Sequence, residues 1–374
     1  MSLRVPFMSL TPGPDAAVVR AGIDRVIERG WFILGPELEA FEQEFAASCG
    51  ASHAVGVGTG TDALALALRG LGIGPGDEVI TSPLSAAYSG FAIVMAGATP
   101  VFTDLDPARL TLDPRAAEAA ITSRTTAIMP VHIYGQPADM TAFSSIASRH
   151  ALAIVEDACQ AHGATCAGRP VGTFGSAGAF SFYPTKNLGA LGDGGAIVTN
   201  NAALADKLKR LRNGGQTDRY HHPELGVNSR LDELQAAVLR ARLPRLAAGN
   251  ARRRAIAALY RSALAGGPVT VPPECDPGHV YHLFVILARD RDAFQAHLHS
   301  QGVGTLVHYP IPVPRQAAFA AYAPAACPIA DRICAEVCSL PMHPQLSDAD
   351  AREVVAAVTS FRGARGVEAS GRVP

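Results

Sequence analysis

The sequence has little that would suit a membrane-bound, secreted or nucleic-acid-binding protein. Across its 374 residues no apolar run approaches the length that spans a bilayer, and residues 1–7 hold no sustained apolar segment typical of a secretory signal. The formal net charge is −1, so no basic excess marks a nucleic-acid surface. We therefore expect a cytoplasmic protein with neither a membrane nor a nucleic acid as partner.

Paired cysteine motifs are also absent. The seven cysteines form no CxxC pair, and no cysteine and histidine spacing suits zinc, so we expect no metal site. The odd count in a chain of this size favours free thiols in a reducing cytosol. Cys334 and Cys338 lie four residues apart, and we expect them on one helix face as small core residues.

Charged residues are scarce, at 17% of the chain against 48% hydrophobic residues. So much apolar material can build a large core and bury a subunit interface as well. We expect a large domain over residues 1–245, with a helical segment at its N-terminus, and a smaller α+β domain over residues 246–374.

Short apolar strands alternate with helices in the first half of the chain. Two helices, at 15–29 and 37–49, come first. The strands are then expected at 53–57, 78–81, 99–103, 126–131, 151–155, 177–182 and 196–199, with helices at 61–71, 86–96, 140–150 and 202–212. This alternation indicates a mostly parallel sheet buried on both faces, whose ligands gather at the carboxyl ends of its strands.

The second half changes its pattern. Residues 228–262 are expected to be helical, with a break or kink at Pro244, and the run Arg252–Arg254 suits a solvated helix face. A strand at 281–287 and helices at 290–301, 327–339 and 347–361 are expected to follow. The tail from Gly363 is expected to fray.

Lys186 and Asp157 each follow a predicted strand end, where alone a lysine or an aspartate is ordinary. Together they place an amine and a carboxylate at the edge where ligands bind. A lysine forms an imine with the aldehyde of pyridoxal phosphate, and an aspartate keeps the ring nitrogen protonated. Gln160, three residues after Asp157, is placed to reach the ring oxygen. His162 suits either a structural role or a place near Asp157.

A glycine-rich turn at residues 58–62 opens a helix directly after a strand. Backbone N–H groups at such a helix start attract a phosphate, although the motif alone more often means simple turn chemistry. It fits neither GxGxxG nor the Walker pattern, which argues against a dinucleotide or ATP site.

Several linked motifs resemble those of the sugar-nucleotide aminotransferases of the DegT/StrS group. They lie at 60–64, 156–163, 181–195, 228–237 and 308–312, with shorter matches at 35–42, 97–101 and 131–135. The resemblance covers about residues 28–345, in the same order as in that family. It implies the pyridoxal-phosphate-dependent aspartate aminotransferase-like (type I) α/β fold, with a mostly parallel seven-stranded sheet in the large domain and a smaller α+β C-terminal domain.

The resemblance also implies residue roles. Lys186 would be the Schiff-base lysine and proton carrier, Asp157 the partner of the pyridine nitrogen, and Gln160 the partner of the ring hydroxyl. Gly60, Thr61 and Ser181 would hold the cofactor phosphate, and Asn228 would reach it from the neighbouring subunit of a homodimer. Substrate would meet a set of four side chains: Tyr183, His308, Tyr309 and Arg230, the last with a structural ion pair as the equal alternative.

Two departures from the family pattern bear on the site. Ala86 stands where relatives carry an aromatic that stacks on the cofactor ring, and Tyr88 is two residues on, where a helix would direct it elsewhere. Pro314 and Arg315 stand where relatives often carry a histidine.

The resemblance implies a two-stage reaction, in which glutamate gives up its amino group and a nucleotide-linked keto-sugar receives it. Residues 228–233 are most similar to family members acting on dTDP-linked 3-keto-6-deoxyhexoses; a 4-keto sugar or a keto-cyclitol stays open. A cofactor-dependent sugar dehydratase of the same fold is disfavoured because such relatives replace the lysine with histidine. A non-catalytic regulatory module is disfavoured because it needs no such full set of cofactor residues.

Overall fold

The computed structural model describes residues 3–11, 13–322 and 324–362. The predicted fraying from Gly363 lies outside these residues. No helix among them is long and apolar enough to cross a membrane.

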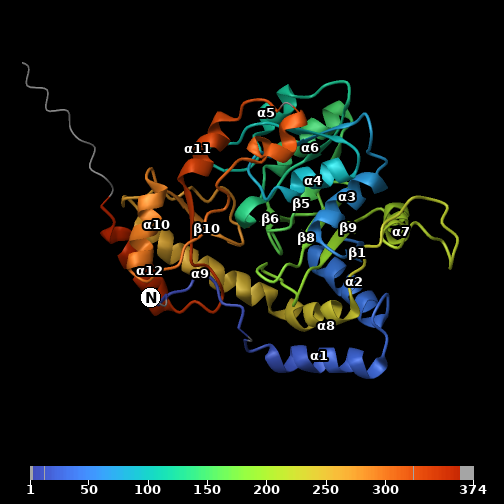
Figure 1. The fold of residues 1–374 in the computed structure, drawn as a ribbon, viewed down its shortest axis with the longest axis horizontal. Coiled ribbons are helices and arrows are strands. Elements are labelled where there is room, and N and C mark those ends of the chain that lie inside the picture. The colour runs from blue at the N-terminus through green and yellow to red at the C-terminus, as the bar shows by residue number, and fades with distance from the viewer. Residues whose placement is uncertain (1–2, 12, 323, 363–374) are drawn as a thin grey trace, which may run out of the picture.

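A seven-stranded sheet forms the centre of the large domain (Figure 1). Its strands in spatial order are β1 (His53–Val57), β9 (Gly195–Thr199), β8 (Ala177–Ser181), β5 (Ala153–Asp157), β4 (Thr125–Met129), β2 (Glu78–Thr81) and β3 (Thr99–Phe102). Among these seven strands, β9 runs opposite to the other six, so the expected mostly parallel sheet is confirmed.

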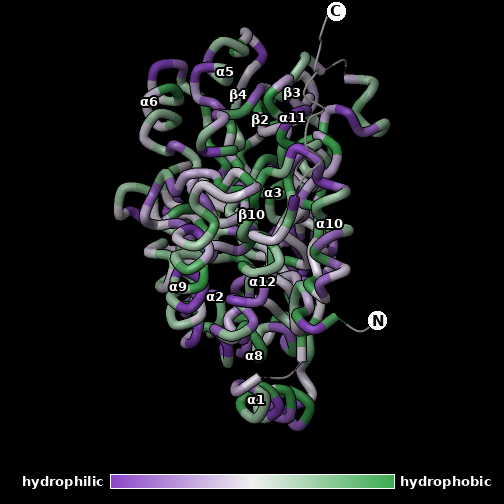
Figure 2. The backbone as a smooth tube through the Cα atoms, turned by 90° about the vertical axis from the view of Figure 1, so that its left-hand side faces the viewer, coloured by the Kyte–Doolittle hydropathy of each residue, from purple (hydrophilic) through white to green (hydrophobic). Residues whose placement is uncertain are grey.

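Helices cover both faces of this sheet, as its nearly continuous apolar strands require. One face packs against α3 (Gly60–Gly70), α4 (Tyr88–Met95) and α7 (Ala202–Leu211), and the other against α2 (Pro36–Cys49), α6 (Met140–His150) and α8 (Glu233–Arg242). Phe180 of β8 belongs to the second layer, whereas Ala179, its neighbour in the strand, belongs to the first. Figure 2 shows the interior around α3 mostly hydrophobic, whereas α6 at the outside mixes both colours.

The short helix α5 (Pro114–Ala119) and the two-stranded ribbon of β6 (Thr165–Cys166) and β7 (Arg169–Pro170) were not predicted. Six- and two-residue elements carry too little periodicity to be found from sequence.

The predicted smaller domain would begin with the long helix α9 (Leu246–Leu264) (Figure 1). The predicted break at Pro244 is confirmed as a short 3₁₀ turn, Leu243–Arg245, between α8 and α9. The proposed boundary at 245–246 falls at the end of this turn. Val5 nevertheless packs in the same core as α9 and α12 (Asp348–Ser360), and the N–H groups of Arg4 and Val5 donate to the Gly302 carbonyl, so residues 4–5 lie against this later part of the chain.

Helices surround a two-stranded sheet in this domain. Its elements are β10 (Phe284–Leu287), β11 (Val337–Leu340), α10 (Arg291–Ser300), α11 (Pro328–Glu336) and α12 (Asp348–Ser360). The predicted helix 327–339 is wrong in its last turn, because the chain leaves α11 at Glu336 and pairs with β10. Cys334 and Cys338 are both buried, as expected, but they do not share a helix face.

The predicted solvated face at Arg252–Arg254 is also wrong. Arg253 is 4% exposed and donates to three backbone carbonyls, those of Tyr281, His282 and Met342. Charge runs usually face water, but here the carbonyls supply the acceptors that a buried guanidinium needs.

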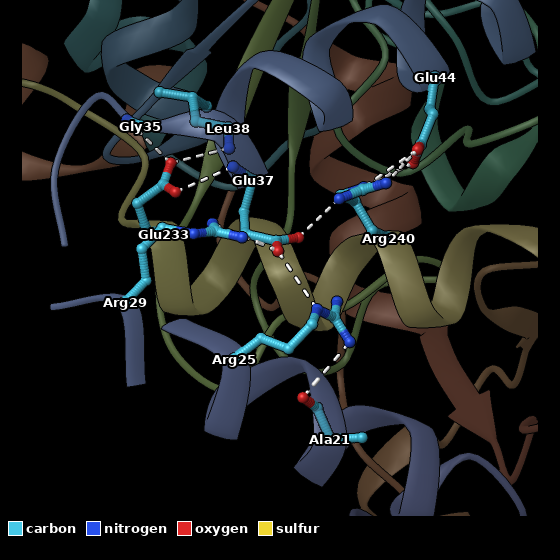
Figure 3. A network of polar contacts seen from close by, with 9 residues as sticks. All are labelled: Ala21, Arg25, Arg29, Gly35, Glu37, Leu38, Glu44, Glu233 and Arg240. Atoms are coloured by element: carbon cyan, nitrogen blue, oxygen red, sulfur yellow. Dashed lines mark hydrogen bonds and ion pairs between the residues drawn. The ribbon is translucent and has the colours of Figure 1, made fainter. Parts of the chain in front are cut away.

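Helix α1 (Ala16–Arg29) is attached to the large domain by a network of carboxylates and guanidinium groups (Figure 3). The fully buried carboxylate of Glu233 accepts from the backbone N–H groups of Gly35, Glu37 and Leu38, and so caps α2. The Glu37 carboxylate pairs in turn with guanidinium groups of α1 and α8, those of Arg25, Arg29 and Arg240. This network fixes the start of α8, directly after residues 228–232.

Candidate active site

Three of the predicted site segments converge at the carboxyl ends of strands of the seven-stranded sheet. Asp157 ends β5, Ser181 ends β8, and Gly60 starts the helix after β1. A Cβ atom added to Gly60 would lie 2.7 Å from the Ser181 Cβ and 2.9 Å from the Cys159 Sγ. The glycine therefore allows the glycine-rich turn at residues 58–62 to approach the other two segments closely.

The Asp157 carboxylate is buried but has hydrogen-bond donors. Its Oδ2 accepts from the Ser89 hydroxyl at 2.7 Å and its Oδ1 from the Cys159 backbone N–H at 3.1 Å. The Ser85 hydroxyl lies 2.7 Å from that of Ser89. Donors on both oxygens let a carboxylate remain where water is scarce.

The start of α3 forms an anion cradle. The Thr59 Oγ1 caps the Asp62 N–H at 3.0 Å, whereas the N–H groups of Gly60 and Thr61 have no acceptor among the described residues. The Ser181 hydroxyl accepts from the Tyr183 N–H at 3.3 Å, which leaves its own hydrogen free to donate. The predicted set Gly60, Thr61 and Ser181 is thus brought together with donors available for a phosphate.

Lys186 lies half-buried in the turn after β8, where its backbone N–H donates to the Tyr183 carbonyl at 2.8 Å. Burial lowers the pKa of the Lys186 amine, and the negative charge of the Asp157 carboxylate opposes that effect. A lowered pKa leaves more of the amine in the uncharged form that attacks a carbonyl.

Gln160 connects the large domain to the smaller one. Its Oε1 accepts from the Tyr134 N–H at 2.7 Å, and its Nε2 donates to the Tyr309 hydroxyl at 3.1 Å. Burial raises the pKa of Tyr309 to about 12, so the phenol keeps its proton at neutral pH. The Tyr134 hydroxyl donates to the His308 carbonyl, which fixes the segment that carries Tyr309.

Three uncharged imidazoles belong to the same surroundings. Burial, helped by the charge of Lys186, lowers the pKa of His162 to about 3 and that of His308 to about 4. The same two causes lower the pKa of His282 well below its usual value. His162 packs between the rings of Phe180 and Phe182, and neither of its nitrogens has a partner among the described residues.

The remaining predicted residues are less buried than Asp157. Tyr183 is 51% exposed, and Asn228 is also exposed at the rim. Arg230 donates to the Asn213 Oδ1 at 3.0 Å, so its described partner is an amide and not a carboxylate. The His308 Nδ1 lies 2.8 Å from the Ser339 hydroxyl.

The structure shows the surroundings of the residues at the two departures from the family pattern. Tyr88 begins α4 and is 62% exposed. Its ring and that of Phe91 form a T-shaped pair with their centroids 6.1 Å apart. Arg315 pairs at the surface with Asp331 at 2.8 Å. Ala86, at the expected stacking position, is half-buried.

Sequence reasoning missed several residues of this site. They are Ser89, Tyr134, Asn187, Asn250 and His282. Ser89 gave a usable signal, because it lies in the first turn of the helix that follows strand β2 of the same sheet. Asn250 and His282 gave none, because only the fold brings α9 and residues 280–282 against the lysine segment.

Comparison with known proteins agrees with this geometry. The DegT/DnrJ/EryC1/StrS aminotransferase family matches residues 16–359. A dTDP-3-amino-3,4,6-trideoxy-alpha-D-glucose transaminase of Streptomyces venezuelae is 51% identical over 96% of both chains. A dTDP-3-amino-3,6-dideoxy-alpha-D-galactopyranose transaminase of Aneurinibacillus thermoaerophilus is 47% identical over 92% of this chain and 95% of its own.

Solved structures agree as well. DesV of S. venezuelae, in complex with a ketimine intermediate, superposes with a TM-score of 0.92 at 50% identity, over 96% of this chain and 98% of its own. NtdA of Bacillus subtilis, with bound cofactor PMP, superposes with a TM-score of 0.90 at 31% identity, over 96% of this chain and 85% of its own. The predicted aminotransferase fold is confirmed, and the chain belongs to the DegT/DnrJ/EryC1/StrS aminotransferase family.

Proposed function

We propose that this aminotransferase uses pyridoxal phosphate to move an amino group from glutamate to a nucleotide-linked keto-sugar, with a dTDP-linked 3-keto-6-deoxyhexose as the favoured acceptor. The observation that carries the proposal is the meeting of three groups at one sheet edge: a buried carboxylate, an amine with a lowered pKa and a cradle of free N–H donors. The relatives whose names specify 3-amino dTDP-sugars support the acceptor. A 4-keto sugar or a keto-cyclitol remains the alternative.

The residues present fit the cofactor. The glycine at residue 60 and the unpaired N–H groups beside it suit a phosphate, and Asp157 suits a protonated ring nitrogen. When bound, the cofactor supplies an aldehyde that carries the amino group and a ring that withdraws electrons.

The chain's own residues position the reactants and move protons. Lys186 would hold the cofactor at rest and, once released, carry a proton between the donor carbon and the cofactor. Asp157, fixed by Ser89 and by the Cys159 N–H, would keep the ring nitrogen protonated. Gln160 and Tyr309 would align the ring oxygen, and His308, Tyr183 and Arg230 would face the sugar nucleotide.

Visible spectroscopy of the full-length protein tests this proposal. Wild-type protein supplied with pyridoxal phosphate should absorb in the visible range, and glutamate should move the absorbance to shorter wavelength as the amino group transfers. Lys186→Ala should lose the visible band and at least about a thousandfold of amino transfer. A wild-type protein with no band, or a band that neither glutamate nor glutamine changes, would refute the proposal.

The exposed apolar side chains beside the site support a homodimer of this chain. Trp31, Phe32 and Leu191 are each about half exposed or more. They are joined to the start of α8, because the Phe32 carbonyl accepts from the Glu233 N–H and the Leu191 N–H donates to Gln235. A patch of this kind is typical of a protein interface. We propose that a second copy covers it and that Asn228 donates to the phosphate bound by the partner.

Asn228→Asp tests the shared site. A carboxylate beside the phosphate, with the amide donor lost, should weaken cofactor affinity by about tenfold to a hundredfold, measured by fluorescence titration. Mixing this variant with Lys186→Ala should restore activity in part, because one site of each mixed dimer would have both residues intact. Unchanged cofactor affinity would contradict the role of Asn228, and a monomer by light scattering would contradict the dimer.

The proposal also includes a domain boundary and a cellular location. We place the boundary between the large and small domains at residues 245–246, in keeping with the 3₁₀ turn before α9. All seven cysteines lie in the described part of the chain and none is paired, which suits the reducing cytoplasm that we propose as its location.

A further inference from the structure

The residue after Lys186 is held by the smaller domain through a chain of amide groups. The Asn187 Nδ2 donates to the Asn250 Oδ1 at 2.8 Å and to the Val280 carbonyl at 3.2 Å. The Asn187 Oδ1 lies 3.2 Å from the His282 Nδ1. Asn250 is 3% exposed, and His282 is 4% exposed.

Two backbone carbonyls fix which way the amides point. The Val280 carbonyl accepts only from an N–H, so the Asn187 nitrogen faces it and the Asn187 oxygen faces His282. The Asn250 Nδ2 donates at 2.8 Å to the His162 carbonyl, so the Asn250 oxygen faces Asn187. No alternative orientation satisfies both carbonyls.

This orientation determines the proton position on His282. Because the Asn187 oxygen only accepts, the Nδ1 of His282 must carry the proton and donate it. The Nε2 is then the unprotonated nitrogen, with no partner among the described residues. An uncharged imidazole in this tautomer adds no positive charge beside the Lys186 amine.

The network is anchored at both ends. The backbone carbonyl of His282 accepts from the buried Arg253 of α9 at 3.2 Å. Farther along the lysine segment, Arg242 donates to the Gly189 carbonyl at 2.6 Å and to that of Ala190 at 3.2 Å. The segment after Lys186 is therefore held by α8 and α9. These helices are separate from the strands whose carboxyl ends carry Asp157 and Ser181.

We propose that His282 and Asn250 are positioning residues that act through Asn187 to hold the Lys186 segment, with His282 as an Nδ1–H donor. The role of Lys186 as the reacting amine rests on the proposed function; the network itself does not. By fixing the position of this segment, the network would keep the Lys186 amine away from water. The titratable groups that interact electrostatically with this amine are Asp157, Cys159, His162, His282 and His308.

Two substitutions of His282 separate this role from direct chemistry at the amine or the substrate. Asn places an N–H donor near the position of the histidine Nδ1, whereas Gln places its amide near the position of Nε2. His282→Asn should therefore preserve the bond to Asn187, and His282→Gln should lose it. Asn250→Leu, of similar size, removes the other support of Asn187.

The readout is the pKa of Lys186 in the full-length protein freed of cofactor. Competitive labelling with an amine-reactive acetylating reagent across pH, followed by mass spectrometry, gives this pKa directly. Loss of the network should let water reach the amine and raise its pKa toward the ordinary value. A rise of one unit makes labelling at neutral pH about tenfold slower. We expect a rise of this size in His282→Gln and in Asn250→Leu, and a wild-type value in His282→Asn.

Several outcomes overturn the proposal. One is a raised pKa in His282→Asn with a wild-type value in His282→Gln, which would assign the work to Nε2. Another is a wild-type value in all three variants. If His282→Gln fails to fold, as judged by thermal unfolding, Asn250→Leu against His282→Asn decides the case. The labelling result stands whether or not the wild-type protein shows a cofactor band, so failure of the proposed function is seen separately.

Discussion

The buried titratable groups around Lys186 fall into two sets that differ in their hydrogen-bond partners. Asp157 has a hydroxyl donor on one oxygen and a backbone N–H donor on the other, which suits a negative charge. The imidazoles of His162, His282 and His308 have no carboxylate partner in the part of the chain that the structure describes, and burial lowers the pKa of each. The amine therefore faces one fixed carboxylate and a group of uncharged rings.

This difference suggests a division of labour. One carboxylate is enough to keep a cofactor ring nitrogen protonated, and a second buried charge nearby would alter the pKa of the amine. Uncharged imidazoles fill space and accept or donate hydrogen bonds without that effect. Removing the charge of Asp157 and the imidazole of His162 tests this difference between the two sets.

The largest effect is expected from Asp157→Asn, which keeps the shape and removes the charge. Amino transfer should fall on the order of a hundredfold or more, because the ring nitrogen would lose its counter-charge. Ser89→Ala keeps the charge and removes one donor to it, so the loss should be about tenfold at most. Single-turnover rates measure both, with Asp206→Asn on the exposed surface of α7 as the control.

An equal loss in Ser89→Ala and Asp157→Asn would contradict the comparison. It would mean that the orientation of the carboxylate matters as much as its charge. A wild-type rate of amino transfer in Asp157→Asn would show that Asp157 has no role in the reaction.

The carboxylate side of the site was predictable from the sequence, whereas most of the imidazole side was not. Asp157 and Ser181 end strands of one mostly parallel sheet and Gly60 follows another, and topology brings such positions to one edge. His282 and Asn250 come from segments whose contacts depend on how α9 lies against the large domain. Periodicity carries no information on that packing, so their part in the site appears only in the structure.

The same limit explains the errors in the smaller domain. The apolar pattern at 327–339 suits a helix throughout, but pairing with β10 outweighs local preference from Val337 onward. Arg253 was placed in water because charge runs usually are, and only the structure reveals the three carbonyls that accept from it. The prediction of the seven-stranded sheet was correct, because its short apolar strands alternate with helices in a regular pattern.

The smallest effect is expected from His162→Phe, which tests the uncharged side through stability. The pKa of His162 is about 3 in the folded chain, below the usual value of 6.5, so between these pH values the unfolded chain binds a proton that the folded chain does not. The free energy of unfolding therefore falls as pH falls through this window, by about 1.4 kcal/mol per pH unit for one such group.

Phenylalanine suits the space between Phe180 and Phe182, and no hydrogen bond of the imidazole would be lost. Denaturant unfolding between pH 4 and pH 6 should then depend on pH with a slope lower by about one proton in His162→Phe than in the wild type. His299→Phe, at an exposed position of α10, is the matched control and should leave the slope unchanged. An unaltered slope in His162→Phe would mean that His162 takes up its proton while folded, and the surroundings of Lys186 would then hold a second charge.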